Sequence, residues 1–382
     1  MAVTAKPAGV RLRRRDRLHA ARLDWVLVAA ALALSLLGCV LIASAGAETV
    51  GSAPAKRQLL SVIVAVVLAF AVTRVEPRSL RAWTPALYLV SLVGQLLPFT
   101  PMGVSIAGAR AWFALPLGFT VQPSEFAKLA LICALAATLA GGPRDQSVPN
   151  DVVVRALALA GLPLAIVLIG NDTGSAMVIT GVVAVIMLVA GVSWKWLVGL
   201  AAAGVVVATA AIAFGLLADY QMKRLTSFLD PTADPYGAGL NTIQARIAVG
   251  SGGVVGRGLF EGPQTQGGFV PVNDSDFVFS VAAEELGLVG GLLLLMLLAL
   301  VLWRGLRIAF EARDMFGRLI AVGVVAWFAL QSFENIGMNL GVMPVTGVTL
   351  PFVSYGGSSM IAAWLGIGLL QLVRLTSAPP PR

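Results

Sequence analysis

The stretch WVLVAAALALSLLGCVLIASA, residues 25–45, contains no charged side chain. The hydrocarbon core of a bilayer is crossed by a helix of about 20 predominantly apolar residues. Because backbone polar groups in lipid must pair within the segment, this run predicts a helix rather than a strand. The run also imitates a secretory signal, and its LLGC imitates a lipoprotein cleavage site. It is longer than the roughly 7–15 apolar residues of a signal core, which favours an uncleaved first transmembrane helix over cleavage.

Nine further apolar runs follow along the chain. The protein has 382 residues, of which 58% are hydrophobic and 12% charged, and its mean hydropathy is +0.88. Soluble domains are nearer half apolar and a quarter charged. We therefore expect an all-α integral membrane protein with ten transmembrane helices, near residues 25–45, 57–74, 83–99, 122–140, 152–169, 174–191, 194–217, 277–302, 319–340 and 358–373.

The distribution of basic residues predicts the orientation. If the N-terminus is cytoplasmic, 19 of the 27 Lys and Arg residues fall on the cytoplasmic side and seven on the outer side. Cytoplasmic segments are enriched in Lys and Arg, so both termini are expected to be cytoplasmic. The expected organisation is a basic tail over 1–23, a membrane domain over 24–373 and a tail over 374–382. The net charge of +8 is then explained by basic residues that fix the orientation in the membrane and are attracted to anionic lipid. It gives no reason to expect nucleic-acid binding.

Some kinds of chemistry are excluded by composition. The two cysteines, Cys39 and Cys133, both lie in apolar runs and indicate neither a disulfide framework nor a metal site. The single histidine, His19, lies in the basic N-terminus, which excludes His-based catalysis and a His metal cluster. The one long connection, 218–276, lies on the outer face. It is too polar to span and too rich in Gly for a compact domain, and loops of this length are usually functional.

Four carboxylates occur where this loop meets the eighth helix, in PVNDSDFVFSVAAEELG (271–287). Asp274 and Asp276 lie at the start of the helix, where either would suit an N-cap. Glu284 and Glu285 lie about 12 Å further along it and would need polar partners in lipid. A carboxylate at a half-dry interface has a raised pKa, which suits a general base. Composition alone does not separate base from cap.

Other polar residues interrupt the apolar runs. Glu125 and Lys128, in QPSEFAKLAL, lie three residues apart on one helix face, either as a self-neutralising pair or as cavity-lining groups. Asp172, between two apolar runs, is either a helix cap or a site residue. For Glu334 and Asn335, the expected role is hydrogen bonding between helices.

Two glycine-rich stretches resemble binding loops. GSGGVVGRG (250–258) has no flanking strand and no following Gly-Lys-Ser/Thr, so it is not a dinucleotide or phosphate fingerprint. A turn close to a substrate or to a helix remains open. SYGGSS (354–359) is typical of a turn or re-entrant element, with backbone donors and hydroxyls near the outer face.

Several long motifs in order resemble the shape, elongation, division and sporulation (SEDS) family of polytopic peptidoglycan glycosyltransferases. The resemblance covers nearly all of 24–373. The LDW start, short tails and overall length are more similar to the RodA subfamily than to FtsW. The motifs are LDW and IASA in the first helix, GARAWF (108–113), QPSEFAKLAL (122–131), NTIQARIAVGSGGVVGRG (241–258), QTQGGFVPVNDSDFVFSVAAEELG (264–287) and NIGMNLGVMPVTGVTLPFVSYGGSS (335–359).

The resemblance implies a ten-helix bundle with a large outer loop between the seventh and eighth helices, in the bacterial cell membrane. It implies polymerisation of lipid II into glycan strands during cell elongation, with a class B penicillin-binding protein as transpeptidase partner alongside other membrane proteins of the elongation complex. The family's essential aspartate falls on Asp276, as general base on the acceptor sugar hydroxyl, with undecaprenyl pyrophosphate as leaving group. No dedicated metal-ligand cluster is visible, although pyrophosphate chemistry often recruits magnesium or manganese.

Positive charge near the leaving group would offset its developing negative charge. The pair Glu125–Lys128 matches the family's cavity-lining pair, and Asp172 matches the aspartate of a conserved family turn. Glu284 and Glu285 match the family's EELG and are expected to shape the helix environment. The candidate substrate-binding and cavity residues are Arg57, Arg110, Glu125, Lys128, Asp172, Lys223, Asp274, Ser354, Gly356 and Gly357.

The sequence departs from the family pattern at two places. Gly170-Asn171 replaces the usual Gln-Pro before Asp172, which leaves the conformation of that turn open. Asp274 stands where the family often has histidine, and two aspartates so close could share a proton and raise the pKa of one.

Three rival functions remain. A flippase for the lipid-linked precursor would suit ten helices with buried charge, but paired broken helices in two matching halves are not visible. A septal, FtsW-type polymerase and a non-catalytic scaffold of the cell-wall machinery are the others.

Overall fold

The computed structural model describes residues 22–47, 51–106, 108–115, 119–141, 147–215, 219–231, 234–235, 237 and 239–377. Most of the expected cytoplasmic tails, with His19, and positions 216–218 of the expected seventh helix and outer loop lie outside these residues.

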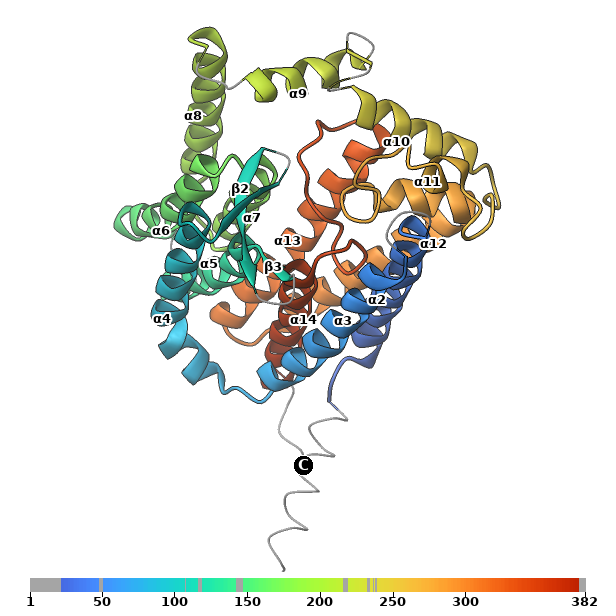
Figure 1. Ribbon diagram of the computed structural model, residues 1–382. Coiled ribbons are helices and arrows are strands. Elements are labelled where there is room, and N and C mark those ends of the chain that lie inside the picture. Colours follow the sequence, from blue (N-terminus) through green and yellow to red (C-terminus); the bar gives the residue numbers. More distant parts are fainter. Residues whose placement is uncertain are drawn as a thin grey trace, which may run out of the picture.

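All ten apolar segments expected to be helical are helices in the described part of the chain (Figure 1). Among the described residues, eight helices are long and apolar enough to cross a membrane, and α7 is a shorter apolar helix. The chain is therefore a multi-pass membrane protein by length and composition. The ten helices are α2 (Trp25–Ala45), α3 (Ala53–Val72), α4 (Pro77–Leu96), α5 (Pro123–Leu139), α6 (Asn150–Ile169), α7 (Thr173–Val189), α8 (Trp194–Ala213), α12 (Val278–Glu311), α13 (Met315–Leu340) and α14 (Gly357–Ser377).

Local sequence explains several helix starts. Pro77 and Pro123 open α4 and α5, where proline's fixed φ suits the first turn and its missing N–H costs nothing. Asp24 and Asp172 cap α2 and α7, each with a carboxylate oxygen that accepts a first-turn N–H.

Strands are the feature that the all-α expectation lacked. A three-stranded antiparallel sheet in the order β1-β2-β3 follows the short 3-10 helix η1 (Leu97–Phe99). Its strands are too short to cross a bilayer, and they satisfy their backbone groups by pairing with one another. They are β1 (Gly103–Ile106), β2 (Ala109–Leu115) and β3 (Phe119–Val121).

The long loop also contains more structure than its glycine content predicts. It forms α9 (Asp219–Leu229), α10 (Leu240–Ser251) and the single-turn α11 (Pro263–Gln266). In Figure 1, α9 lies across the top of the molecule between α8 and α10. The helix α10 packs against α12 and α13, so this part of the loop is anchored to the bundle.

The two ends of the bundle domain meet at one side of the molecule. The backbone N–H of Asp24 donates to the Gln371 side-chain oxygen over 2.9 Å, and the Gln371 amide donates back to the Asp24 carbonyl over 2.9 Å. The buried Asp24 carboxylate accepts from Arg304 Nε at 2.8 Å. The start of α2 and the end of α14 are thus held at the same side.

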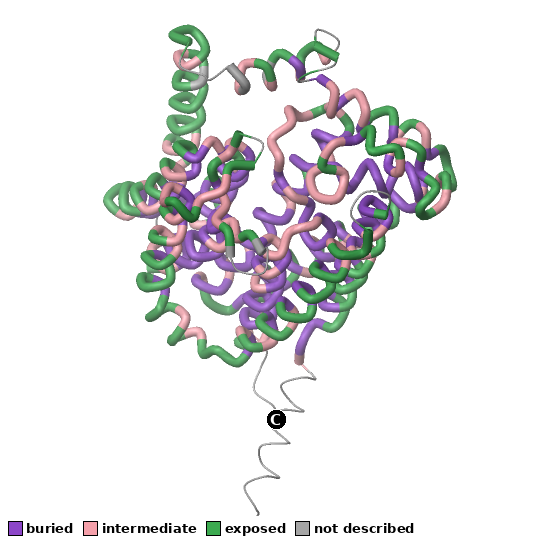
Figure 2. The backbone as a smooth tube through the Cα atoms, in the orientation of Figure 1, coloured by how far each residue is buried: buried purple, intermediate pink, exposed green. Residues whose placement is uncertain are grey.

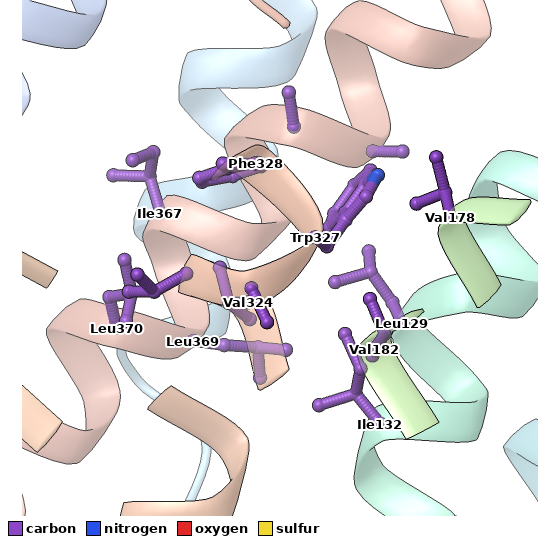
Figure 3. Packing of buried hydrophobic residues seen from close by; sticks show 14 of the residues in the cluster. Leu129, Ile132, Val178, Val182, Val324, Trp327, Phe328, Ile367, Leu369 and Leu370 are labelled. Carbon is purple, nitrogen blue, oxygen red and sulfur yellow. The ribbon is translucent and has the colours of Figure 1, made fainter. Parts of the chain in front are cut away.

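The core lies between α5, α7, α13 and α14 (Figure 3). Trp327 and Phe328 on α13 lie between Leu129 and Val178 on one side and Ile367 on the other. Figure 2 shows buried backbone in the centre and exposed backbone along α8. No residue of α8 whose side chain is described is buried, although the helix is apolar, which fits a helix surrounded by lipid.

The helix α12 is broken at Gly287, where φ is 66° and ψ is −163°. The glycine-rich loop fills the break: the Arg257 N–H donates to the Glu284 carbonyl, and the Gly253 carbonyl accepts from the Leu288 N–H, both over 3.0 Å. Side chains at Gly252 or Gly256 would overlap carbonyl oxygens of α12. The sequence left two roles open for the glycine-rich loop, a turn close to a substrate or a turn close to a helix. In the structure it lies against the helix α12.

Both glutamates beside the break hold outer segments. Glu284 accepts from the backbone N–H groups of Gln264 and Thr265 at 2.8 and 2.9 Å, and from the Thr265 hydroxyl at 2.6 Å. Glu285 accepts from the Ser44 hydroxyl at 2.6 Å. They tie α11 and the end of α2 to α12.

We expect Gly256→Ala to destabilise the protein by about 2–4 kcal/mol, because Gly256 has φ of +87° and a Cβ there would overlap the Glu285 carbonyl oxygen. Gly250→Ala is the matched control, since Gly250 lies in α10 with nothing within 4 Å of an added Cβ. Midpoints of thermal unfolding in detergent compare the two variants. If the two variants unfold at the same temperature, the close fit of the glycine-rich loop into the break of α12 does not contribute to stability.

Candidate active site

A cavity of about 240 Å³ lies between the sheet, the start of α7, α9 and the loop before α14. Its wall is mostly polar or aromatic, and segments far apart in the sequence meet there. The lining residues that matter below are Trp112, Gln122, Asn171, Asp172, Arg224, Asn241, Ser275, Asp276, Thr346, Gly347, Tyr355 and Gly356.

Asp276 lines this cavity and does not cap the helix that follows it. The N-cap of α12 is Phe277, and no side chain of that residue caps the helix. The Asp276 Oδ1 accepts from the Ser275 hydroxyl at 3.0 Å. A Cβ at Gly347 would stand 3.4 Å from Oδ2, in ordinary van der Waals contact, so the glycine keeps a side chain away from this oxygen. The capping role that the sequence left open for Asp276 is not realised.

The backbone around Asp276 is held residue by residue. The Tyr355 N–H donates to the Asp274 carbonyl at 2.9 Å, and the Ser354 hydroxyl donates to the Ser275 carbonyl at 2.5 Å. The amides of Asn335 and Asn339 both donate to the Asp276 carbonyl, at 2.9 and 3.1 Å. Three consecutive carbonyls are thereby fixed before α12 begins.

The electrostatics of the cavity favour a basic carboxylate. Burial raises the pKa of Asp276 from 3.8 to about 6, against the lowering effect of the Ser275 hydroxyl. The negative charges of Asp274 and Asp172 raise the pKa further, and the positive charge of Arg224 lowers it. Burial also raises the pKa of Asp274, while backbone N–H groups lower it. Such a group is largely ionised at neutral pH and is a stronger base than an ordinary aspartate.

Asp172 combines the two roles that its sequence context allowed. Its Oδ1 caps α7 by accepting the Ser175 N–H at 3.0 Å, and its Oδ2 accepts from the Gln122 amide at 2.9 Å. It also lines the cavity. The preceding Asn171 has φ of 61°, which asparagine tolerates and proline, locked near −65°, does not. The turn therefore has a conformation that the family's Gln-Pro could not adopt at this position.

Glu125 and Lys128 form a buried ion pair, with Lys128 Nζ at 2.7 Å from the Glu125 Oε1. The same ammonium group donates to Gln331 at 2.7 Å and lies 5.1 Å from the Trp327 ring centroid. The Gln331 amide donates to the Thr349 carbonyl at 2.9 Å, and Thr349 lines the cavity. The pair supports the cavity wall from behind instead of lining it.

The remaining candidates lie at varied distances from the cavity. Arg110 lines a separate small cavity that shares Asp172 with the larger one, and its Nε donates to the Pro98 carbonyl at 3.0 Å. Arg57 and Lys223 are exposed and do not line the larger cavity. Gly356 lines it, and Gly357 begins α14 behind it.

Sequence reasoning missed Arg224, Trp112 and Asn339. Arg224 is the one basic residue among those that line the cavity in the described part of the chain. Its neighbour Lys223 was the candidate because nothing local in the sequence tells which face of α9 turns inward. Trp112 lies in the same GARAWF motif as Arg110. The motif marks this segment, but the sequence does not show that the Trp112 side chain lines the cavity.

Comparisons with known proteins agree with the motifs. The sequence profile of the FtsW, RodA and SpoVE cell cycle proteins matches residues 24–378. Stage V sporulation protein E of Bacillus subtilis is 36% identical over 354 residues, which cover 91% of this chain and 95% of that protein. Peptidoglycan glycosyltransferase MrdB of Escherichia coli K12 is 36% identical over 359 residues, covering 94% of each chain.

Solved structures agree as well. A chain from a peptidoglycan synthase complex, described as coordinating polymerisation and crosslinking, is 37% identical with a TM-score of 0.78, covering 93% of this chain and 98% of that one. Thermus thermophilus RodA, a rod shape determining protein, is 33% identical with a TM-score of 0.67, covering 92% of this chain and 96% of that one. A profile match over almost the whole chain, together with these relatives, places this protein in the SEDS family of FtsW, RodA and SpoVE.

Proposed function

We propose that this protein is a peptidoglycan glycosyltransferase that polymerises lipid II, with Asp276 as its general base. The observation that carries the assignment is the Asp276 carboxylate, which lines a polar cavity, is free of capping and has a pKa near 6. Relatives named peptidoglycan glycosyltransferase MrdB and FtsW support the substrate class.

In the proposed reaction, Asp276 takes the proton from the acceptor sugar hydroxyl as its oxygen bonds to the anomeric carbon of the donor. The bond from that carbon to the diphosphate oxygen breaks, and undecaprenyl pyrophosphate leaves with the electron pair. Trp112 and Tyr355 offer aromatic faces to the sugar rings. The fixed backbone around Asp276 keeps the carboxylate in place during the transfer.

The leaving diphosphate needs positive charge, and Arg224 is the arginine within the cavity. Its planar guanidinium suits bidentate phosphate contacts. Arg110 lines the small neighbouring cavity that shares Asp172 with the larger one, so it is the second candidate for the diphosphate. The described residues contain no cluster of three or more metal-ligating side chains. Asp172 and Asp276 both line the cavity, and a Mg²⁺ or Mn²⁺ ion held mainly by the substrate phosphates beside them would neutralise diphosphate charge.

The cellular setting is proposed from the same family. The helices would span the bacterial cell membrane ten times with both termini cytoplasmic, which places the 218–276 loop and the cavity outside. A class B penicillin-binding protein is the proposed partner, supported by the related synthase complex. The LDW motif at the beginning of the first helix, which resembles the RodA subfamily, supports cell elongation over septal synthesis.

The broken α12 is the feature that would most favour a transporter, because transporters use unwound backbone to coordinate ions. Here the glycine-rich loop occupies backbone groups on both sides of the break. This arrangement supports a polymerase over a flippase.

Asp276→Asn should lower glycan synthesis from labelled lipid II by about 10²–10⁴-fold, because the amide cannot accept the proton. The purified protein is assayed alone and with a class B partner, and a thermal melt checks folding. A full polymer ladder from a folded variant would overturn the base assignment. Wild-type protein that makes no ladder and moves labelled lipid across proteoliposomes would make this protein a transporter.

The polymerisation rate should fall as the pH drops through about 6, since the base must be ionised. Asp274→Asn should move this acid limb to lower pH, because the Asp274 charge raises the pKa of Asp276. The pH–rate profiles of both proteins test this coupling. An unmoved limb would dismiss it.

Arg224→Ala should reduce kcat by about 10²–10³-fold, as loss of an electrostatic donor to a departing group does in other enzymes. Arg257→Ala is the charge-matched control, since Arg257 is exposed on the outer loop and lies off the cavity. Arg110→Ala is measured beside them. If kcat falls more in Arg110→Ala than in Arg224→Ala, Arg110 and not Arg224 binds the leaving diphosphate.

A further inference from the structure

The glycine-rich loop that fills the break in α12 also carries apolar side chains on the surface of the protein. Val255 is 81% exposed and Val254 is 64% exposed. Phe260, which follows the loop, is exposed as well. Single exposed apolar side chains are ordinary, but a group that continues a larger apolar surface marks a contact with lipid or with another protein.

The two valines continue the exposed apolar surface of α12. The Gly253 carbonyl accepts from the Leu288 N–H at 3.0 Å, and the Val254 carbonyl accepts from the Val289 N–H at 3.1 Å. Leu288 and Val289 are both more than half exposed. No charged residue occurs from there to Trp303, and α12 is apolar enough to cross a membrane. The exposed side chains of this stretch therefore face lipid, and the valine backbone lies beside the first of them.

Helix α2 shows how thick the apolar layer is at this side of the molecule. Its 21 residues, Trp25–Ala45, rise by 1.5 Å each and span about 30 Å, the thickness of the hydrocarbon core of a bilayer. At its first turn, the carboxylate of Asp24 accepts from Arg304 of α12 at 2.8 Å. The two charged groups mark one boundary of the hydrocarbon core, and α2 ends at the other.

The glycine-rich loop lies at that second boundary. The Ser44 hydroxyl, at the end of α2, donates to Glu285 at 2.6 Å and accepts from the Phe260 N–H at 3.2 Å. Along α12, Leu288 follows Glu285 in the direction of Arg304. Leu288 and the loop backbone that is bonded to it therefore lie on the hydrocarbon side of this boundary.

A non-helical segment is tolerated at this depth only where its backbone polar groups have partners in the protein. The break in α12 supplies such partners. The Arg257 N–H donates to the Glu284 carbonyl, and the Gly258 N–H donates to the Glu285 carbonyl, both over 3.0 Å. The backbone of the loop thus faces the helix, while the two valine side chains are exposed.

We propose that the glycine-rich loop binds membrane lipid, with the side chains of Val254 and Val255 inserted among the acyl chains of one leaflet. The ligand is the acyl chain of a phospholipid. Lipid is favoured over a protein partner because the valines continue a surface of α12 that lipid covers. The loop precedes the segment that carries Asp276, so this contact holds that part of the chain at the membrane.

Quenching of a fluorescent label in proteoliposomes measures the depth of the loop. Val255→Cys is made in a protein with Cys39→Ala and Cys133→Ala, labelled with bimane and reconstituted into phosphatidylcholine and phosphatidylglycerol. Part of the lipid carries a nitroxide near the headgroup end of its acyl chain. We expect this lipid to reduce the fluorescence of the label as much as it does for Leu288→Cys, and iodide in the water to leave it unchanged.

Pro235→Cys is the aqueous control, because Pro235 is exposed in the outer segment between α9 and α10. Its label should lose fluorescence to iodide and keep it in the nitroxide lipid. Val254→Cys gives a second position in the loop and decides the question if Val255→Cys does not fold. Both valine side chains are mostly exposed, so each variant should melt at the wild-type temperature.

Two results would overturn the proposal. A loop label that iodide quenches and the nitroxide lipid does not would lie in water. A loop label that neither quencher reaches would be covered by protein, in this preparation a second copy of the chain. Neither measurement uses polymerase activity, so a wild-type protein that makes no glycan would contradict the proposed function and leave the position of the loop decided.

Discussion

Every backbone polar group in the apolar part of this protein needs a hydrogen-bond partner, and α12 leaves such groups without helical partners at two places, its start and its break at Gly287. An amide buried without a partner costs several kcal/mol in an apolar setting, on the order of what a whole domain has to spare. At Gly287 the glycine-rich loop supplies partners on both sides of the break. At the helix start, asparagines from α13 and the loop before α14 do so. The outer half of the molecule is arranged around these two needs.

This constraint separates the four carboxylates near the start of α12. Glu284 accepts hydrogen bonds from Gln264 and Thr265, and Glu285 accepts one from Ser44, so both serve as anchors. The Asp274 carbonyl is held by Tyr355, which fixes the loop. Asp276 keeps a carboxylate that no helix end uses, and burial makes it a stronger base than an exposed aspartate. The four side chains carry the same functional group, so the difference between Asp276 and the two glutamates lies in the partners that each carboxylate has.

The cavity also joins parts of the chain that fold for different reasons. The sheet contributes Trp112, α9 contributes Arg224 and the capped start of α7 contributes Asp172. Behind the wall, the Glu125–Lys128 pair and Gln331 form a buried polar layer that reaches Thr349. A layer of this kind is stable only when its members are paired, so it keeps the wall in one arrangement. A rigid wall suits a reaction in which two large lipid-linked molecules must meet in one geometry.

The hydrophobic runs by themselves determined the ten helices. A run of about 20 apolar residues is visible within one segment, and in lipid such a segment pairs all its own backbone groups only as a helix. Local chemistry also determined the start of α5 at Pro123, and the family motif singled out Asp276. The tertiary structure alone decided that Asp276 is not a cap, that Arg224 and not Lys223 lines the cavity, and that Gly103–Ile106, Ala109–Leu115 and Phe119–Val121 form a sheet. The first two depend on segments far apart in the sequence: for example, Asn339 lies 59 residues beyond the Ser280 N–H that it accepts. Spacing within one segment carries no information about which distant segments supply its hydrogen bonds or share its cavity.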